Sequence, residues 1–383
     1  MLLASTNMKK HQLLSFILTF LACPVMAQTV QVSDKQATKE TVNLFNNLDK
    51  LRAKGYLVGH QDDLAYGVNW KYKAGRSDIK DMTGDNPAVY GWELGNIEVD
   101  SDVNLDTVPF NKMKSYIREG YERGAVITIS WHGDNPMTGK SAWDPAPGSV
   151  FSVLPGQKSH AVFVKQLDKV AAFLADLKDS QGNPIPILFR PFHELTGNWF
   201  WWGTNGNTPG EFKMMFRFAV DYLRNKKNLH NLLIGYNTGG EFKNKDEFLQ
   251  RYPGDDVVDI VSFDTYAKGN PETDTGFISD LKLHLNIIEQ VAKEHGKVSA
   301  IGEIGFNQIP YGTWFTKILS PALQGHNFAY LLFWRNAGYK ANDNASEYYV
   351  PYKGHPAEAD FVKYYTLPQT LFEKEAAALQ LYK

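Results

Sequence analysis

Two glutamates in the sequence occupy positions where carboxyl groups could do chemistry, because each stands at the end of an apolar run. The run RPFHE ends in Glu194, and Glu303 lies within Val298–Ile304. A carboxyl group is costly to bury there unless it has a partner or a purpose. Two facing carboxyl groups are what glycoside hydrolysis requires, since one donates a proton while the other attacks or activates water. Residue types alone leave an alternative open, in which each glutamate forms a rim salt bridge to Arg190 or Arg335.

Aromatic residues gather around the same positions. The loop GNWFWWG follows Glu194 and contains Trp199, Trp201 and Trp202, and three more tryptophans, Trp131, Trp143 and Trp334, stand near other apolar runs. Sugar rings have apolar faces, so the clefts that bind them combine flat aromatic rings with polar groups. A single tryptophan is more often part of a core. The grouping in polar loops therefore favours a glycan-binding cleft.

A metal site is a competing reading of the polar residues. The candidate ligands are His60, Asp62, Asp63, His132, His193 and Glu303. No pair of them has the HExxH or HxH spacing that is typical of catalytic zinc. The sequence also lacks the G-x-S-x-G motif of serine hydrolases and a G-x-x-x-x-G-K-[ST] phosphate loop. We therefore expect no metal and no cofactor.

Short apolar runs recur along the chain and must position these residues. Eight such runs are predicted to be strands: Tyr56–His60, Ala88–Trp92, Ala125–Trp131, Pro186–Pro191, Leu232–Tyr236, Val258–Phe263, Val298–Ile304 and Ala329–Trp334. Continuous apolar runs without alternation are typical of parallel strands that are buried on both faces.

Longer amphipathic segments lie between most of these strands. The predicted helices are Lys35–Lys54, Val108–Arg123, Ser159–Leu177, Pro209–Asn225, Thr275–His295, Tyr311–Leu323 and Leu367–Tyr382. Eight strand–helix units in one chain predict an α/β fold with a single (β/α)8 TIM barrel, whose active site lies at the C-terminal ends of the strands. A doubly wound sheet is less consistent, because no glycine-rich turn follows the first strand.

Length and charge agree with one globular domain. The chain has 383 residues, with 43% hydrophobic and 21% charged residues and a formal net charge of −2. The charge argues against a nucleic-acid binder that relies on a basic surface. No linker or repeat is visible, so residues 28–383 are predicted to form one catalytic domain.

The first 27 residues are predicted to be an export signal. Lys9 and Lys10 precede the apolar run Leu13–Ala22, and a small-residue cleavage site ends at Ala27. This predicts an exported protein, with the periplasm as its location. Cys23, the single cysteine, leaves lipid anchoring open as an alternative, and secretion is another. No later segment is predicted to span a membrane.

Five short motifs resemble those of the glycoside hydrolase family 26 β-mannanases, including those of gut Bacteroides, over nearly the whole of residues 28–383. The motifs are RPFHE with Trp199 five residues on, IGEIG around Glu303, SFDTY ending in Tyr266, SWH ending in His132, and FWR ending in Arg335. The resemblance implies a retaining enzyme with Glu194 as the acid/base and Glu303 as the nucleophile. It also implies substrate-binding or supporting roles for His132, Trp143, His193, Trp199, Asp264, Tyr266, Trp334 and Arg335.

The resemblance further implies a substrate: β-1,4-linked mannan, galactomannan, glucomannan or manno-oligosaccharides. Release of mannobiose from chain ends is a hypothesis, because long loops at Asp100–Phe110 and Asn135–Leu154 could close one end of the cleft. A mixed-linkage β-glucanase on the same scaffold and a non-catalytic glycan-binding protein remain alternatives. We expect a monomer without a nucleic-acid partner.

Overall fold

The computed structural model describes residues 30–341 and 344–383. The predicted export signal, including Cys23, lies outside the described residues. Within the described ranges, no helix combines the length and the apolar character that crossing a bilayer would need.

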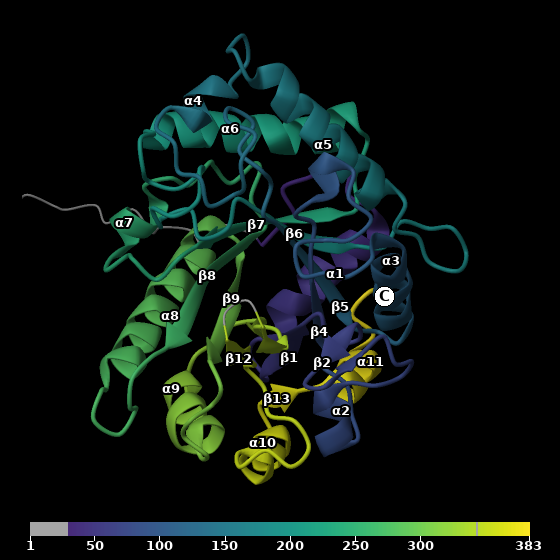
Figure 1. Cartoon of the computed structure of the whole chain (residues 1–383), viewed down its shortest axis with the longest axis vertical. Helices are drawn as coiled ribbons and strands as arrows, with labels where there is room; N and C mark the ends of the chain where they lie inside the picture. The colour runs from purple at the N-terminus through teal and green to yellow at the C-terminus, as the bar shows by residue number, and fades with distance from the viewer. Residues whose placement is uncertain (1–29, 342–343) are drawn as a thin grey trace, which may run out of the picture.

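Eight parallel strands form a closed barrel with helices around its outside (Figure 1). The strands follow one another in chain order, and β10 pairs with β1 to close the ring. Their bounds are β1 Tyr56–Gln61, β4 Val89–Glu93, β5 Val126–Trp131, β6 Ile187–Pro191, β7 Leu232–Thr238, β8 Ile260–Ala267, β9 Val298–Phe306 and β10 Tyr330–Phe333. All eight predicted strands are present, and the predicted (β/α)8 TIM barrel is confirmed.

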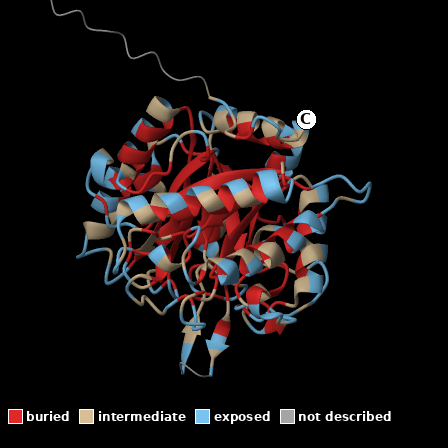
Figure 2. Ribbon diagram, turned by 90° about the horizontal axis from the view of Figure 1, so that it is seen from above, coloured by how far each residue is buried: buried red, intermediate tan, exposed pale blue. Residues whose placement is uncertain are grey.

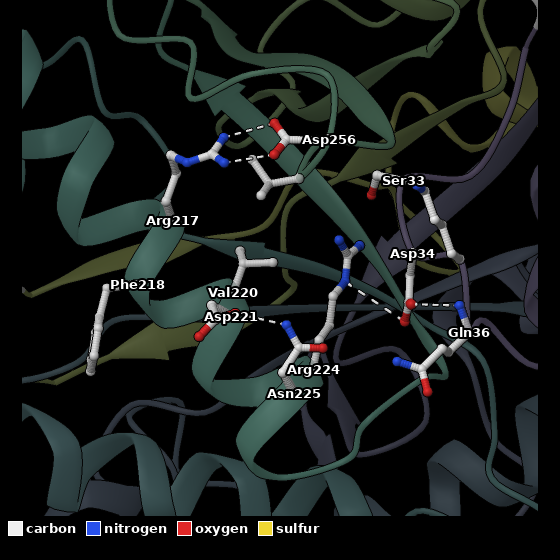
Figure 3. Close-up of a pocket in the computed structure, with 12 residues that line it drawn as sticks. Ser33, Asp34, Gln36, Arg217, Phe218, Val220, Asp221, Arg224, Asn225 and Asp256 are labelled. Carbon is white, nitrogen blue, oxygen red and sulfur yellow. Dashed lines mark hydrogen bonds and ion pairs between the residues drawn. The ribbon is translucent and has the colours of Figure 1, made fainter.

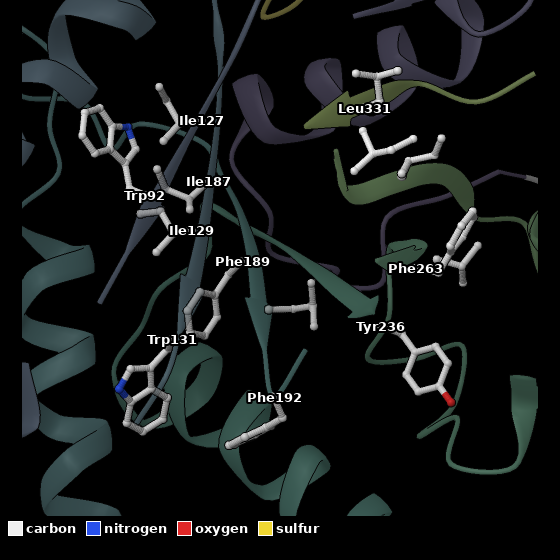
Figure 4. Packing of buried hydrophobic residues seen from close by; sticks show 14 of the residues in the cluster. Trp92, Ile127, Ile129, Trp131, Ile187, Phe189, Phe192, Tyr236, Phe263 and Leu331 are labelled. Carbon is white, nitrogen blue, oxygen red and sulfur yellow. The ribbon is translucent and has the colours of Figure 1, made fainter. Parts of the chain in front are cut away.

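The strands are buried on both faces, as their apolar runs predicted. Every residue of β1, β4, β5, β6, β7, β9 and β10 is buried. Figure 2 shows these buried residues concentrated in the barrel and on the inner sides of the surrounding helices. Side chains such as Ile127, Ile187 and Phe189 belong to one core cluster (Figure 4). A second cluster joins Leu44, Phe45 and Leu48 of α1 to barrel residues such as Leu57 and Leu233, so the first helix packs on the barrel core.

The helices that cover the barrel mostly match the predicted segments. They are α1 Lys39–Leu51, α2 Asp78–Thr83, α3 Phe110–Glu122, α4 Ser149–Ser152, α5 His160–Ala175, α6 Pro209–Asp221, α7 Lys245–Leu249, α8 Gly276–His295, α9 Ser320–Leu323, α10 Glu358–Tyr365 and α11 Glu373–Leu379. Local sequence signals fix several ends. Thr208 and Glu211 form a capping box before α6, with Pro209 in the first turn. Gly296 ends α8 in the left-handed region, with φ of 64°.

The predicted C-terminal helix Leu367–Tyr382 is wrong in its first half. Thr370–Leu371 instead form β13, which pairs in parallel with β1, and only Glu373–Leu379 is helical. Pro368 disfavours helical geometry at the residue before it, and the backbone amide of Tyr56 bonds the carbonyl of Gln369 at 2.9 Å. Pairing with a barrel strand therefore outweighs helix propensity here.

The predicted helix Tyr311–Leu323 also starts later than expected. Its helical part is a π-helix, η3, at Phe315–Leu319, followed by α9. A similar π-helix, η2, at Tyr222–Lys226 continues α6. The 3-10 turn η1 at Ile97–Val99 follows β4. Two hairpins were not predicted: β2 Tyr66–Gly67 with β3 Trp70–Lys71, and β11 Gly338–Lys340 with β12 Ala345–Glu347.

Candidate active site

Glu194 stands on a strained turn just after β6. Phe192 and Glu194 have φ of 54° and 50°, a left-handed conformation that costs a residue with a side chain about 1–2 kcal/mol. Aromatic packing holds the turn, since the Phe192 ring lies among those of Trp131 and Trp202. The Trp202 indole also donates to the backbone oxygen of His193 at 2.8 Å. Strain of this kind persists where the surroundings enforce it, and it collects at functional sites.

Glu303 is aimed by an irregularity in β9. Ile301 and Glu303 pair with consecutive residues of β8, Phe263 and Asp264, so Gly302 is the extra residue of a bulge. A Cβ on Gly302 would lie 2.0 Å from Oδ1 of Asn237 and 2.6 Å from Oδ1 of Asp264. Only glycine therefore fits directly before this glutamate.

Two donors hold the Glu303 carboxyl group. Arg190 Nη2 donates to Oε1 at 3.0 Å, and the Tyr266 hydroxyl donates to Oε2 at 2.6 Å. Burial and the Glu303 charge raise the pKa of Tyr266 well above its usual value, so the phenol keeps its proton. Donation to both oxygens fixes the position of the carboxyl group, as a nucleophile requires.

Glu194 lies close to Glu303 but in a different electrostatic setting. Oxygen atoms of Glu194, Asp264 and Glu303 all lie within 4.8 Å of one another. Burial, together with the Glu303 charge, raises the pKa of Glu194 to about 7, while the Trp199 indole donates to its Oε2 at 2.8 Å and opposes the rise. Burial and the Glu303 charge also raise the pKa of Asp264 well above its usual value. One carboxyl group with two strong donors thus stands beside two whose pKa values are raised by burial and by its charge.

A chain of polar side chains flanks the glutamates on the β4 and β5 side. Burial alone would lower the pKa of His132, but Glu93, whose Oε2 lies 2.9 Å from His132 Nδ1, raises it. Burial would likewise raise the pKa of Glu93, yet His132 and neighbouring donors lower it to about 2. Burial, His132 and Arg190 lower the pKa of His193 well below its usual value. The Nε2 atoms of His132 and His193 lie 3.1 Å apart, so one hydrogen bond joins the two imidazoles.

An open cleft of about 620 Å³ continues from this region. It is lined by Leu105, Asp106, His132, Trp143, Trp334, Arg335, Lys340, Ala341 and Glu347. Trp143 is 48% exposed and stacks on His132, with ring centres 4.9 Å apart. Arg335 pairs with Asp106 and, at 2.7 Å, with Glu347, so it joins the 100–110 loop to the β11–β12 hairpin.

The structure brings together the residues that the sequence singled out. Glu194, Glu303, His193, Trp199, Asp264 and Tyr266 share one end of the barrel, and His132, Trp143, Trp334 and Arg335 line the adjoining cleft. The alternative in which the glutamates form rim salt bridges is confirmed in part, because Arg190 contacts Glu303. Arg335 pairs instead with Asp106 and Glu347.

Other expectations were wrong. Trp131, Trp201 and Trp202 are buried in the core, so they do not form sugar platforms. Sequence reasoning placed Glu93 at the end of a predicted strand but gave it no role, and it missed Asp106, Asn237 and Glu347 as parts of the site. Glu93 and Asn237 directly follow predicted strands, and that position was the signal that could have found them.

The histidines do not support the interpretation of these polar residues as a metal site. His60 Nδ1 lies 2.6 Å from Asp63, and Tyr66 donates to Asp62 at 2.6 Å, so each of these groups has a partner within the protein. In the part of the chain that the structure describes, the one trio spaced to share an ion is Glu194, Asp264 and Glu303. The guanidinium of Arg190 already supplies a positive charge there.

A second pocket of about 650 Å³ lies away from these acids, between the N-terminal segment and α6 (Figure 3). Ion pairs cross it, including Arg217 with Asp256 at 2.6 Å. Arg224 bonds Asp259, which precedes β8, so this pocket belongs to the N-terminal ends of the strands. Active sites of such barrels lie at the opposite end.

A barrel mouth with two adjacent carboxyl groups, one protonated and one held by donors, is the arrangement of retaining glycoside hydrolases. Comparison with known proteins agrees. The family model "Glycosyl hydrolase family 26" matches residues 33–323, and the chain therefore belongs to that family.

Similar proteins carry mannanase names. A mannan endo-1,4-beta-mannosidase of Bifidobacterium adolescentis is 34% identical over 361 residues, covering 87% of this chain and 34% of that protein. One of Bacillus subtilis is 28% identical over 280 residues, covering 67% of this chain and 74% of that protein. A solved GH26 beta-mannanase from Bacteroides ovatus aligns with TM-score 0.85 and 39% identity, covering 90% of this chain and 98% of that one. The chain thus spans about a third of the Bifidobacterium relative but nearly all of the Bacteroides structure.

Proposed function

We propose that this protein is a retaining β-mannanase that cleaves β-1,4-mannosidic linkages in mannan, galactomannan, glucomannan and manno-oligosaccharides. The observation that carries the proposal is the close approach of Glu194 and Glu303, whose oxygens come within 4.8 Å. Retaining enzymes place their two carboxyl groups about 5–5.5 Å apart, which leaves no room for the water of an inverting mechanism.

In the first step, Glu303 attacks the anomeric carbon and Glu194 gives its proton to the departing glycosidic oxygen. A pKa of about 7 keeps Glu194 mostly protonated in mildly acidic solution and about half protonated at neutral pH. The products are a glycosyl ester on Glu303 and the released sugar. Esterification removes the Glu303 charge, which had raised the proton affinity of Glu194. Glu194, already a carboxylate after the first step, therefore stays ionised and takes a proton from the water that hydrolyses the ester.

The aromatic residues supply the sugar contacts in this proposal. Trp334 forms the platform of the −1 subsite, and Trp199 lies beside the +1 subsite while its indole holds Glu194. His132 and Trp143 line the −1 and −2 side. Tyr266 releases its hydrogen bond as Glu303 is glycosylated. Asp264 is buried, which favours a supporting role for it.

Reducing-sugar release from a panel of mannans, mixed-linkage glucan and xylan tests the proposal. Glu194→Ala and Glu303→Ala should each lower turnover on mannans by orders of magnitude. Glu122→Ala, at the exposed end of α3, is the matched control and should stay active. Proton NMR should show the β-anomer as the first product. Activity on glucan alone would mean that the substrate is glucan and not mannan. No activity on any polymer would favour the glycan-binding alternative.

We further propose that the enzyme releases mannobiose from chain ends. Leu105 and Asp106 of the 100–110 loop reach the cleft beside Trp143, and Arg335, which follows β10, ties that loop to the β11–β12 hairpin. Mannopentaose should yield mannobiose and mannotriose as first products. A broad mixture of early products from a polymer would contradict end action.

We also propose that the protein is an exported monomer. The support is the sequence of residues 1–27, with Cys23 as a potential lipid site. Cell fractionation should place the activity in the periplasm, while Cys23-dependent labelling with palmitate would indicate an anchored form instead. Light scattering of residues 28–383 should give the mass of a single chain.

A further inference from the structure

Asn237 lies on β7 and contacts Arg190 and Asp264, two residues close to the Glu303 carboxyl group. Its side chain is fully buried, at 0% exposure. Its Nδ2 donates to Oδ2 of Asp264 at 2.6 Å. Its Oδ1 accepts from the Ser262 hydroxyl at 2.5 Å and, more weakly, from Nη1 of Arg190 at 3.5 Å. One amide therefore contacts both the cation and the buried acid of the carboxylate cluster.

The orientation of this amide follows from its neighbours. A guanidinium has only donors, so the amide oxygen must face Arg190 and the amide nitrogen must face Asp264. Asp264 Oδ2 is then the acceptor of this hydrogen bond. Oδ1 is buried without a hydrogen-bond partner among the described residues, and it lies 3.6 Å from Nη1 of Arg190.

Arg190 lies between two carboxyl groups, since its Nη1 is 3.6 Å from Oδ1 of Asp264 and its Nη2 is 3.0 Å from Oε1 of Glu303. Burial and the charges of Glu303 and Glu194 raise the pKa of Asp264, while Arg190 and the hydrogen bond from Asn237 oppose the rise. The placement of the guanidinium between the two groups therefore decides how well it supports Glu303. An ionised Asp264 would compete for Arg190 and would also raise the proton affinity of Glu194.

We propose that Asn237 is a positioning residue that aligns Arg190 on Glu303 and fixes the Asp264 carboxyl group beside them. The proposal rests on the proposed function, because it assigns Glu303 the role of nucleophile. The bulge in β9 supports it independently. The position of a Cβ at Gly302 falls 2.0 Å from the Asn237 amide oxygen, so the backbone beside Glu303 packs directly on this side chain.

Asn237→Ala and the near-isosteric Asn237→Asp test the proposal, with Asn231→Ala as the matched control. Asn231 precedes the same strand, is buried, and donates to the backbone oxygen of Ile185 at 2.7 Å. Asn231→Ala should lower the melting temperature and leave kcat and the pH profile unchanged. Asn237→Ala should lower kcat about 10- to 100-fold, as expected for loss of a group that holds a catalytic carboxylate, with KM changed less than about threefold.

Asn237→Asp should move the basic limb of the kcat/KM profile to higher pH, because a new negative charge raises the proton affinity of Glu194. The charged and titratable groups that face Asp264 are Arg190 of β6, Glu194 after β6, Tyr266 of β8, Glu303 of β9 and Tyr330 of β10. None of these five residues is changed in Asn237→Asp, so a shift of the basic limb reports the charge of the new carboxyl group.

A crystal structure of Asn237→Ala supplies a readout that needs no activity. The Arg190–Glu303 contact of 3.0 Å should lengthen or change partner. Retention of that contact, or a variant whose kcat and pH profile match those of Asn231→Ala, would overturn the proposal. If the wild type hydrolyses no glycan while Arg190 still moves in the variant, the proposed function fails and the positioning of Arg190 by Asn237 stands.

Discussion

The hydroxyl group of Tyr266 donates a 2.6 Å hydrogen bond to Oε2 of Glu303. Both residues lie on barrel strands, Tyr266 near the end of β8 and Glu303 in β9, so the bond joins rigid elements. Tyr349 packs against Tyr266 with ring centres 5.5 Å apart and restricts the phenol from another side. This fixed donor engages one oxygen of Glu303, Oε2. The fold therefore defines the orientation in which Glu303 attacks.

Tyr266→Phe should therefore slow the attack of Glu303 while leaving the fold intact. Loss of one preorganised donor to a catalytic oxygen lowers kcat about 100-fold, and the phenyl ring preserves the packing. Initial rates on mannopentaose measure the effect, and circular dichroism checks the fold. The expectation fails if kcat changes less than about threefold.

Trp199→Phe should move the pH profile as well as the rate. The indole donates to Oε2 of Glu194 and thereby lowers the proton affinity of that carboxyl group. Removing the donor raises the pKa of Glu194 above its present value of about 7, so the basic limb of kcat/KM should shift to higher pH. Trp314→Phe is the control, because the Trp314 ring packs against Phe315 and Phe333 and its N–H has no partner among the described residues. An unshifted basic limb in Trp199→Phe would count against the role of this bond.

Glu194→Gln should make the folded protein more stable above neutral pH. A carboxyl group with a folded-state pKa of about 7 and an ordinary value of 4.5 binds its proton more tightly when folded. Its ionisation thus lowers the free energy of unfolding progressively between pH 4.5 and 7, by about 1.4 kcal/mol for each tenfold difference in proton affinity. Glutamine avoids that loss. The melting temperature of the variant should exceed that of the wild type at pH 8, and the two should converge at pH 4. Equal gains at both pH values would point to a cause other than ionisation.

The sequence predicted the barrel because its strands are buried on both faces and therefore read as continuous apolar runs. β7 and β9 illustrate this, since every residue in them is buried. Periodicity failed where tertiary pairing decided the outcome. Residues 367–382 have helical spacing, yet Thr370 and Leu371 pair with β1. The two short hairpins escaped prediction because runs of two or three residues carry no periodicity.

The acids could be predicted because an apolar strand that ends in a carboxyl group is unusual whatever its neighbours are. The position of the supporting residues at strand ends was visible, but their roles could not be predicted. Asn237 and Glu93 act through contacts with residues distant in sequence, Asn237 with Arg190 and Asp264, and Glu93 with His132. A strained turn at Phe192 is likewise invisible in the sequence, since it depends on rings packed from other elements.

Substitution of two tryptophans in the same region should separate effects on substrate binding from effects on stability. Trp143 is 48% exposed and stacks on His132 at the cleft, whereas Trp201 is 1% exposed and packs edge-on against Phe192 and Trp202. Trp143→Ala should raise KM for manno-oligosaccharides several-fold, since an aromatic contact is worth about 0.5–1.5 kcal/mol, and should barely change the melting temperature. Trp201→Ala should lower the free energy of unfolding by about 3–5 kcal/mol through the cavity it leaves. Thermal melts and KM values for both variants form one experiment. A large loss of stability in Trp143→Ala would mean that its ring is part of the core and not of the substrate cleft.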